Sequence, residues 1–225
     1  MLAIDTSTMF GGVAFLDGEI LRAETRLNVK VAHSERLLGE IHLCLERCAV
    51  RLDDVDVLAL AIGPGSFTGL RVGLSSVKGL AFATGKPVVA VPTLEAFAWN
   101  AAFSAYPVCP LLDARKKEVY GAVYRWAGSG FEHVVPEGAY PIGKLMQKLA
   151  GPTLFLGEGA LAYRPEIESA MGTSALFGPP GVMAPSPAHV AWLGARLAHE
   201  GAFVDPVSLT PRYCRRSEAE LKSGP

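Results

Sequence analysis

The spacing of apolar and polar positions changes period several times along the 225 residues. The first 25 residues hold three short apolar runs separated by turn residues, which predicts a meander of strands over 1–4, 11–18 and 20–25. Residues 33–50 then repeat apolar side chains at three- and four-residue intervals, which predicts a helix. Strands are also expected over 55–62 and 88–91, and helices over 70–83 and 93–103. A mixed sheet covered by helices follows from this order.

The second half begins with strands again. Strands are expected over 108–113, 118–126 and 153–156, a short helix over 142–149, and a longer helix over 187–199. Residues 128–152 carry little other regular signal, and no exact sequence repeat links the halves. We predict an α/β fold with an N-terminal lobe over 1–103, a C-terminal lobe over 104–210 and a tail over 211–225.

Composition narrows the class of function. The net charge is −1, so the surface offers no general attraction for nucleic acid, and a partner is expected to hold most of any RNA. The four cysteines form no C-x-x-C pair and are interpreted as free thiols. The chain begins without a charged leader and has no apolar run of about 18 residues, so we expect a cytoplasmic protein without membrane contact.

The stretch GPGSFTGLR at 63–71 lies between a predicted buried strand and a predicted helix. Its glycine spacing is one residue too long for a dinucleotide-binding fingerprint, and Pro64 removes a backbone donor. The stretch ATGKP at 83–87 lacks the first glycine and the magnesium-binding hydroxyl of a P-loop. Ser66 is not flanked as G-x-S-x-G, which argues against a peptidase. The glycines therefore need another explanation.

Small residues recur along one side of the following helix. A glycine inside a helix costs about 0.5–1 kcal/mol relative to alanine, so the spacing of Gly69, Gly73 and Ser76 indicates a close helix contact. We predict an outward, partner-binding ridge that acts with the helix over 33–50. The alternative is that this ridge packs on the protein's own sheet. The expected interface residues are His33, Leu37, Leu38, Ile41, Leu45, Gly69, Arg71, Val72, Gly73, Ser76 and Leu80.

Several motifs together resemble a known family. Asp5 in D-T-S-T, the opening meander and the two strand-rich halves are similar to the actin, hexokinase and Hsp70 superfamily. The stretches HSERLL at 33–38 and GPGSFTGLR at 63–71 resemble the TsaB family of bacterial tRNA threonylcarbamoyladenosine biosynthesis subunits. The resemblance covers nearly the whole chain and is densest in 1–103. It implies two actin-like, ribonuclease H-like lobes and a tail from Pro211 that returns towards the N-terminal lobe.

The resemblance also implies a function. Such a protein is expected to be a non-catalytic scaffold for a TsaD-like catalytic subunit, which transfers a threonylcarbamoyl group from an adenylate to the adenosine beside the tRNA anticodon. A TsaE-like ATPase is expected to assist the transfer. The scaffold is expected to form a homodimer when alone and to contact tRNA only through the complex. The catalytic sister binds a metal through two histidines one helical turn apart. Here Leu37 follows His33 at that spacing and cannot ligate a metal, so no metal is expected.

The resemblance implies that phosphate is bound at the end of the first strand of each half, and adenosine at a glycine-containing loop of the second half. The positions matching the phosphate turns are Asp5, Ser7, Thr8 and Asp113, and those matching the adenosine loop are Gly157, Glu158 and Gly159. We interpret them as a vestigial nucleotide site, with no cofactor and at most weak adenine-nucleotide binding. Two alternatives stay open: these polar groups only satisfy strand-end backbone, or the protein is a free-standing ATP-dependent small-molecule kinase.

Overall fold

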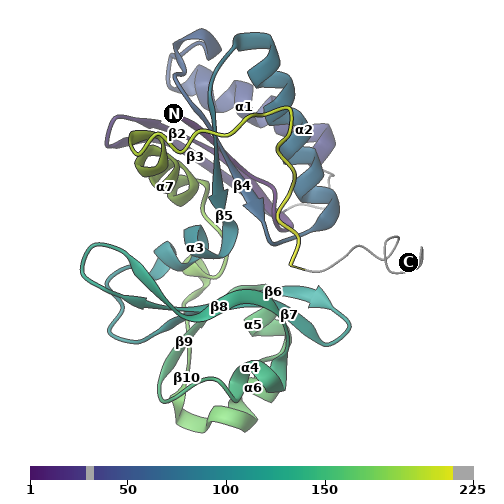
Figure 1. The fold of residues 1–225 in the computed structure, drawn as a ribbon, viewed down its shortest axis with the longest axis vertical. Coiled ribbons are helices and arrows are strands. Elements are labelled where there is room, and N and C mark those ends of the chain that lie inside the picture. The colour runs from purple at the N-terminus through teal and green to yellow at the C-terminus, as the bar shows by residue number, and fades with distance from the viewer. Residues whose placement is uncertain (29–32, 215–225) are drawn as a thin grey trace. The chain divides into compact units, whose positions relative to one another are not determined.

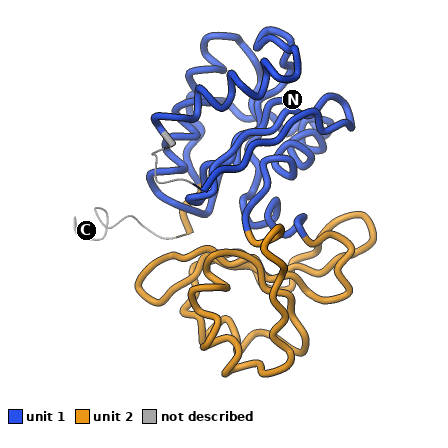
Figure 2. Tube along the Cα trace, turned by 180° about the vertical axis from the view of Figure 1, so that it is seen from behind, with its two compact units in different colours: residues 1–100, 184–211 blue, residues 101–183, 212–225 orange. Residues whose placement is uncertain are grey.

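The computed structural model describes residues 1–28 and 33–214 and shows two compact units (Figure 2). The first unit contains residues 1–100 and 184–211, and the second contains residues 101–183 and the segment from 212 onward. This division differs from the expected boundaries after 103 and 210, because the chain returns to the first unit at residue 184. Of the expected tail, Pro211 belongs to the first unit, Arg212 pairs with Glu137 of the second, and residues 215–225 lie outside the described part.

The first unit is built on a five-stranded mixed sheet in the order β3-β2-β1-β4-β5. The first three strands are antiparallel neighbours, as the meander predicted, and β1, β4 and β5 run parallel. The strands are β1 (Leu2–Asp5), β2 (Phe10–Asp17), β3 (Ile20–Asn28), β4 (Leu58–Gly63) and β5 (Val88–Pro92). The helices are α1 (His33–Arg47), α2 (Phe67–Thr84), α3 (Thr93–Ala98) and α7 (Pro187–His199), with short 3-10 turns η1 (Leu52–Asp54) and η2 (Trp99–Ala101).

The two faces of this sheet carry side chains of different size. Along β4, Leu58, Leu60 and Ile62 face the core shared with α1 and α2. Ala59 and Ala61, which alternate with them, face the core shared with α7. The large residues fill the space beneath α1 and α2, while the alanines leave room for α7 to approach the opposite face closely (Figure 1).

The contacts of α7 explain why residues 184–211 belong to the first unit. A Cβ on Gly194 of α7 would lie 2.8 Å from the Cβ of Ala59, so the helix and the sheet are in direct contact there. At the start of α7, the Glu24 carboxylate on β3 accepts hydrogen bonds from the Ser186 hydroxyl and, at 3.2 Å, from the Ala188 N–H. The helix over 187–199 was therefore predicted correctly and assigned to the wrong lobe.

The second unit repeats the topology of the first. Its sheet has the order β10-β9-β6-β7-β8, with β6, β7 and β8 antiparallel and β6, β9 and β10 parallel. Written from the other edge, this order is β8-β7-β6-β9-β10, which matches β3-β2-β1-β4-β5 of the first unit strand by strand. The predicted class of two actin-like α/β lobes is therefore confirmed. The strands are β6 (Val108–Arg115), β7 (Glu118–Trp126), β8 (Phe131–Pro141), β9 (Thr153–Leu156) and β10 (Ala175–Phe177). The helices are α4 (Ile142–Met146), α5 (Glu158–Ala162) and α6 (Arg164–Met171), with 3-10 turns η3 (Gly172–Ser174) and η4 (Pro180–Val182).

Among the described residues, the structure has no disulfide bond and no membrane-spanning helix. All four cysteines are free, and burial raises the pKa of Cys44 to about 11, so this thiol stays protonated at neutral pH. Within residues 1–28 and 33–214, no helix combines the length and the apolar character that crossing a bilayer requires.

Candidate functional site

The GPGSFTGLR segment connects β4 to α2 and fixes the start of that helix. Ser66 is the N-cap, and its hydroxyl accepts a hydrogen bond from the Gly69 N–H at 3.2 Å. The Ser66 N–H donates to the carbonyl of Ser7 at 2.6 Å, while the Gly63 N–H donates to the Thr93 hydroxyl at 3.0 Å. The loop is thus bonded on both sides to its own unit.

Two glycines of the predicted ridge face inward rather than outward. A Cβ on Gly69 would lie 2.0 Å from the carbonyl oxygen of Thr6, and one on Gly73 would lie 2.3 Å from the Thr6 hydroxyl. The Thr6 hydroxyl also donates to the Gly69 carbonyl at 2.8 Å. The expectation that Gly69 and Gly73 form a partner-binding surface is therefore wrong. They allow α2 to lie against the segment that follows β1, as the alternative interpretation held.

The apolar stripe of α1 is also divided between the core and the surface. Leu37, Ile41 and Leu45 are buried in the core that α1 shares with the sheet. The expected place of Leu37 on an outward face is therefore corrected, whereas Ile41 and Leu45 also border a groove beside α1. Leu38, by contrast, is 61% exposed. A helix with apolar residues spread this widely contacts the sheet with one part of its surface and leaves another part open.

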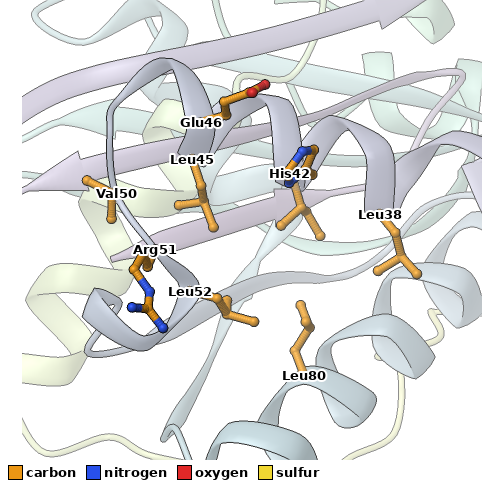
Figure 3. Close-up of a pocket in the computed structure, with 9 residues that line it drawn as sticks. Leu38, His42, Leu45, Glu46, Val50, Arg51, Leu52 and Leu80 are labelled. Carbon is orange, nitrogen blue, oxygen red and sulfur yellow. The ribbon is translucent and has the colours of Figure 1, made fainter.

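A groove of about 480 Å³ lies between α1 and α2. In Figure 3 the side chains of Leu38, Leu52 and Leu80 point into this groove. Polar and charged side chains accompany the apolar ones. The lining residues are Leu38, Ile41, His42, Leu45, Glu46, Val50, Arg51, Leu52 and Leu80. This α1–α2 groove combines an apolar floor with a charged border, which is the arrangement found in protein–protein interfaces.

The other predicted interface residues vary in exposure. Arg71 is exposed, and its guanidinium lies over the Phe67 ring, 3.9 Å from the centroid. Val72 and Ser76 are half-buried, and the side chain of His33 lies outside the described residues. The predicted interface residues did not include Val50, which the expected helix over 33–50 contained, or Leu52, which lies in a turn without helical periodicity of its own.

The hydroxyl-rich segment after β1 is engaged within its own unit. Asp5, Ser7 and Thr8 are all buried. The Asp5 carboxylate accepts hydrogen bonds from the Ser7 N–H at 2.8 Å and the Ser7 hydroxyl at 2.6 Å. A Cβ on Gly65 would lie 2.4 Å from the Ser7 carbonyl oxygen, so the GPGSFTGLR loop packs directly on this segment. These polar groups bond to one another and to neighbouring backbone.

The matching positions of the second unit bring two carboxylates together. Burial raises the pKa of the Glu158 carboxyl, and the negative charge of Asp113 raises it further, while Arg115 opposes the shift. Gly157 has a φ of 100°, and a Cβ on Gly159 would lie 2.9 Å from the Leu111 carbonyl oxygen. Among the described residues, no three His, Cys, Asp or Glu side chains are grouped so as to hold a metal ion.

Comparison with known proteins identifies the family. The family model described as "TsaD: tRNA N6-adenosine threonylcarbamoyltransferase" matches residues 27–223. A Bacillus subtilis protein named "tRNA threonylcarbamoyladenosine biosynthesis protein TsaB" is 33% identical over 225 residues, covering 99% of this chain and 96% of the relative. This chain belongs to the TsaB family. The TsaB protein of Escherichia coli is 31% identical over 99% of this chain and 97% of its own length.

Solved structures agree with membership of the TsaB family. A Pseudomonas aeruginosa structure described as YeaZ superposes with a TM-score of 0.78 at 28% identity, covering 94% of this chain and 98% of the other. A second structure from that organism, described as an uncharacterized protein with similarity to peptidase YEAZ, gives a TM-score of 0.80 at 29% identity and covers 95% and 98% of the two chains. Both matches span the two units, so the likeness to the TsaB family is not confined to the GPGSFTGLR region.

Proposed function

We propose that this protein is a non-catalytic subunit of the complex that transfers a threonylcarbamoyl group from threonylcarbamoyl-adenylate to the adenosine next to the tRNA anticodon. Full-length membership of the TsaB family carries the proposal, because relatives that align end to end bear that pathway in their names. The engaged polar segment after β1 supports a role other than catalysis. The kinase alternative has no support among the relatives named above.

The partners follow from the same proposal. A TsaD-like catalytic subunit binds at the α1–α2 groove, a TsaE-like ATPase completes the complex, and a second copy of this chain occupies the groove when the protein is alone. Leu38 and Leu80 provide apolar contact area, and His42, Glu46 and Arg51 provide polar contacts at the border. The complex works in the cytoplasm, where its tRNA substrate is found.

Reconstitution tests this function. Purified catalytic subunit, ATPase, tRNA, threonine, bicarbonate and ATP, together with the enzyme that makes the adenylate, are combined with or without this protein. We expect threonylcarbamoyladenosine, measured by mass analysis of the digested tRNA, to form in the complete mixture and to fall to background when this protein is omitted. Equal product in both mixtures would exclude the proposed role, and turnover by this protein alone would exclude a non-catalytic one.

Nucleotide titration tests the absence of a cofactor. We expect calorimetric titration of the isolated protein with ATP and Mg²⁺ to show a dissociation constant above about 1 mM. The reason is that the groups of Asp5 and Ser7 that would meet phosphate are buried and bonded to each other. Tight binding accompanied by ATP turnover would instead favour the kinase alternative.

A further inference from the structure

The chain leaves the first unit and returns to it at two residues that are bonded to each other. It passes into the second unit after Asn100 and re-enters the first unit at Ala184. The Asn100 side-chain amide donates a hydrogen bond to the Ala184 carbonyl at 2.6 Å, although 84 residues separate the two in the sequence. The two crossover segments, defined as residues 101–107 and 178–183, are therefore tied together where they join the first unit.

His189 fixes the orientation of the Asn100 side chain. A carbonyl only accepts, so Asn100 presents its NH₂ group to Ala184 and its amide oxygen to His189 of α7. The Nδ1 atom of His189 lies 2.8 Å from that oxygen, so Nδ1 carries a hydrogen and donates it. Burial lowers the pKa of His189, Glu24 raises it and Arg26 lowers it, with burial the largest effect. The imidazole is therefore neutral at pH 7, and its single ring hydrogen is on Nδ1.

The residues that follow Ala184 hold it firmly to the first unit. Pro185 and Pro187 come directly after it, and the fixed φ of each proline leaves this stretch few conformations. The Glu24 carboxylate of β3 accepts the two hydrogen bonds already described at the start of α7. Ala184 is thus connected rigidly to α7 and to the sheet, and Asn100 is bonded to this fixed point.

The crossover segments themselves have the properties of hinge residues. One is the turn that precedes β6, and the other contains the 3-10 turn η4 that follows β10. Phe103 in the first segment is 77% exposed, and a Cβ on Gly181 in the second would meet nothing within 4 Å. Loop and element-terminal residues of this kind absorb the changes in φ and ψ that accompany domain motion.

We propose that Asn100, oriented by His189, is a clamp that makes the two crossover segments act as one hinge. Relative motion is the default expectation for two units joined by short connections. Two connections that move separately give the second unit more freedom than two connections fastened at a common point. The clamp consists of first-unit side chains alone, so it restricts this motion without a ligand or a partner. Asn100 and His189 are positioning residues in this proposal.

The test compares four variants of the full chain. Asn100→Leu has a similar volume and removes both hydrogen bonds, and His189→Leu removes the bond that orients the amide. His189→Asn keeps an N–H group near the place of Nδ1. His199→Leu removes an exposed imidazole from the same helix and is the matched control. Long-range ¹H–¹⁵N correlations of the wild-type protein show which ring nitrogen of His189 carries the hydrogen.

Two measurements report on the hinge. Hydrogen exchange followed by mass spectrometry measures the opening of residues 101–107 and 178–183, with β4 as the internal reference. Spin labels on Glu19→Cys in the β2–β3 turn and Ser129→Cys in the β7–β8 turn measure the distribution of distances between the units. For labelling, Cys48 and Cys214 are replaced by serine, and labelled protein is mixed with excess unlabelled protein so that only distances within one chain are measured.

The expected results separate a clamp from a general structural role. In Asn100→Leu and His189→Leu the crossover segments should exchange about fivefold to tenfold faster, while β4 keeps its wild-type rate. The distance distribution should become broader in both variants. His189→Asn and His199→Leu should match the wild-type protein in both measurements, and the wild-type ring hydrogen should be on Nδ1.

Several outcomes would overturn the clamp. One is unchanged exchange and an unchanged distance distribution in Asn100→Leu. Another is a ring hydrogen on Nε2 alone, because Nδ1 could then not donate to Asn100. Equal acceleration in β4 and in the crossover segments would show that Asn100 supports the whole first unit and does not control a hinge. If Asn100→Leu does not fold, a folded His189→Leu protein with wild-type crossover segments would exclude the clamp.

Discussion

Replacing Gly69 by alanine (Gly69→Ala) is expected to lower the free energy of unfolding by about 2–4 kcal/mol. The new Cβ would lie 2.0 Å from the Thr6 carbonyl oxygen, so either α2 or the segment after β1 must move. Movement of α2 would also disturb the hydrogen bond from the Thr6 hydroxyl to the Gly69 carbonyl. Chemical denaturation of the isolated protein, followed by circular dichroism, measures the change.

The same helix provides a matched control for this prediction. Gly79 of α2 is exposed, and a Cβ there would meet nothing within 4 Å. Gly79→Ala should raise the free energy of unfolding by about 0.5–1 kcal/mol, because alanine has the higher helix propensity. If Gly69→Ala were as harmless as Gly79→Ala, Gly69 would not be in close contact with the segment after β1.

This result changes how substitutions on α2 are interpreted. Gly73 contacts the Thr6 hydroxyl and Leu60, so a leucine at this position would disturb the fold of the protein itself. Loss of partner binding in such a variant would follow from loss of structure and would not locate an interface. Substitutions that probe assembly have to be made on the exposed side of the groove.

The sequence pattern was sufficient to predict the central elements. The run LALAIG of β4 is buried at every position, and an uninterrupted apolar run of this length is typical of a strand covered on both faces. The periodicity of α1 and α7 likewise predicted helices where they occur. β8 was missed because Pro136 and Gly138 lie within it and most of its residues are only partly buried or exposed, so its apolar alternation is weak. β10 has three half-buried residues, too few for a pattern.

Two other errors have one physical cause, which is that local spacing does not specify the partner surface. The periodicity of residues 187–199 predicted a helix, but it contained no signal that this helix packs on a strand more than 100 residues earlier. The spacing of Gly69 and Gly73 showed that something approaches α2 closely. It did not show whether that neighbour was Thr6 of the same chain or another molecule. The outward residue Leu38 was predicted as part of the interface, while the groove floor from Val50 and Leu52 was not.

Replacing Leu38 by aspartate (Leu38→Asp) is expected to weaken association with the catalytic subunit, and self-association, by on the order of tenfold to a hundredfold. The side chain is 61% exposed at the α1–α2 groove, so the free protein should keep its stability to within about 0.5 kcal/mol. In the complex the aspartate would be forced against an apolar surface without a counter-charge, which is strongly unfavourable. Sedimentation velocity and surface-immobilised binding measure the two equilibria.

Leu43→Asp on the same helix is the matched control. Leu43 is 41% exposed, does not line the groove and lies about 140° around the helix from Leu38. The two variants share the residue type, the helix and the new charge, so they differ chiefly in the face that carries the change. Leu38→Asp alone should impair association if the groove is the docking surface. Equal affinities for both variants, or a defect confined to Leu43→Asp, would place the interface on another face of α1 or away from this helix.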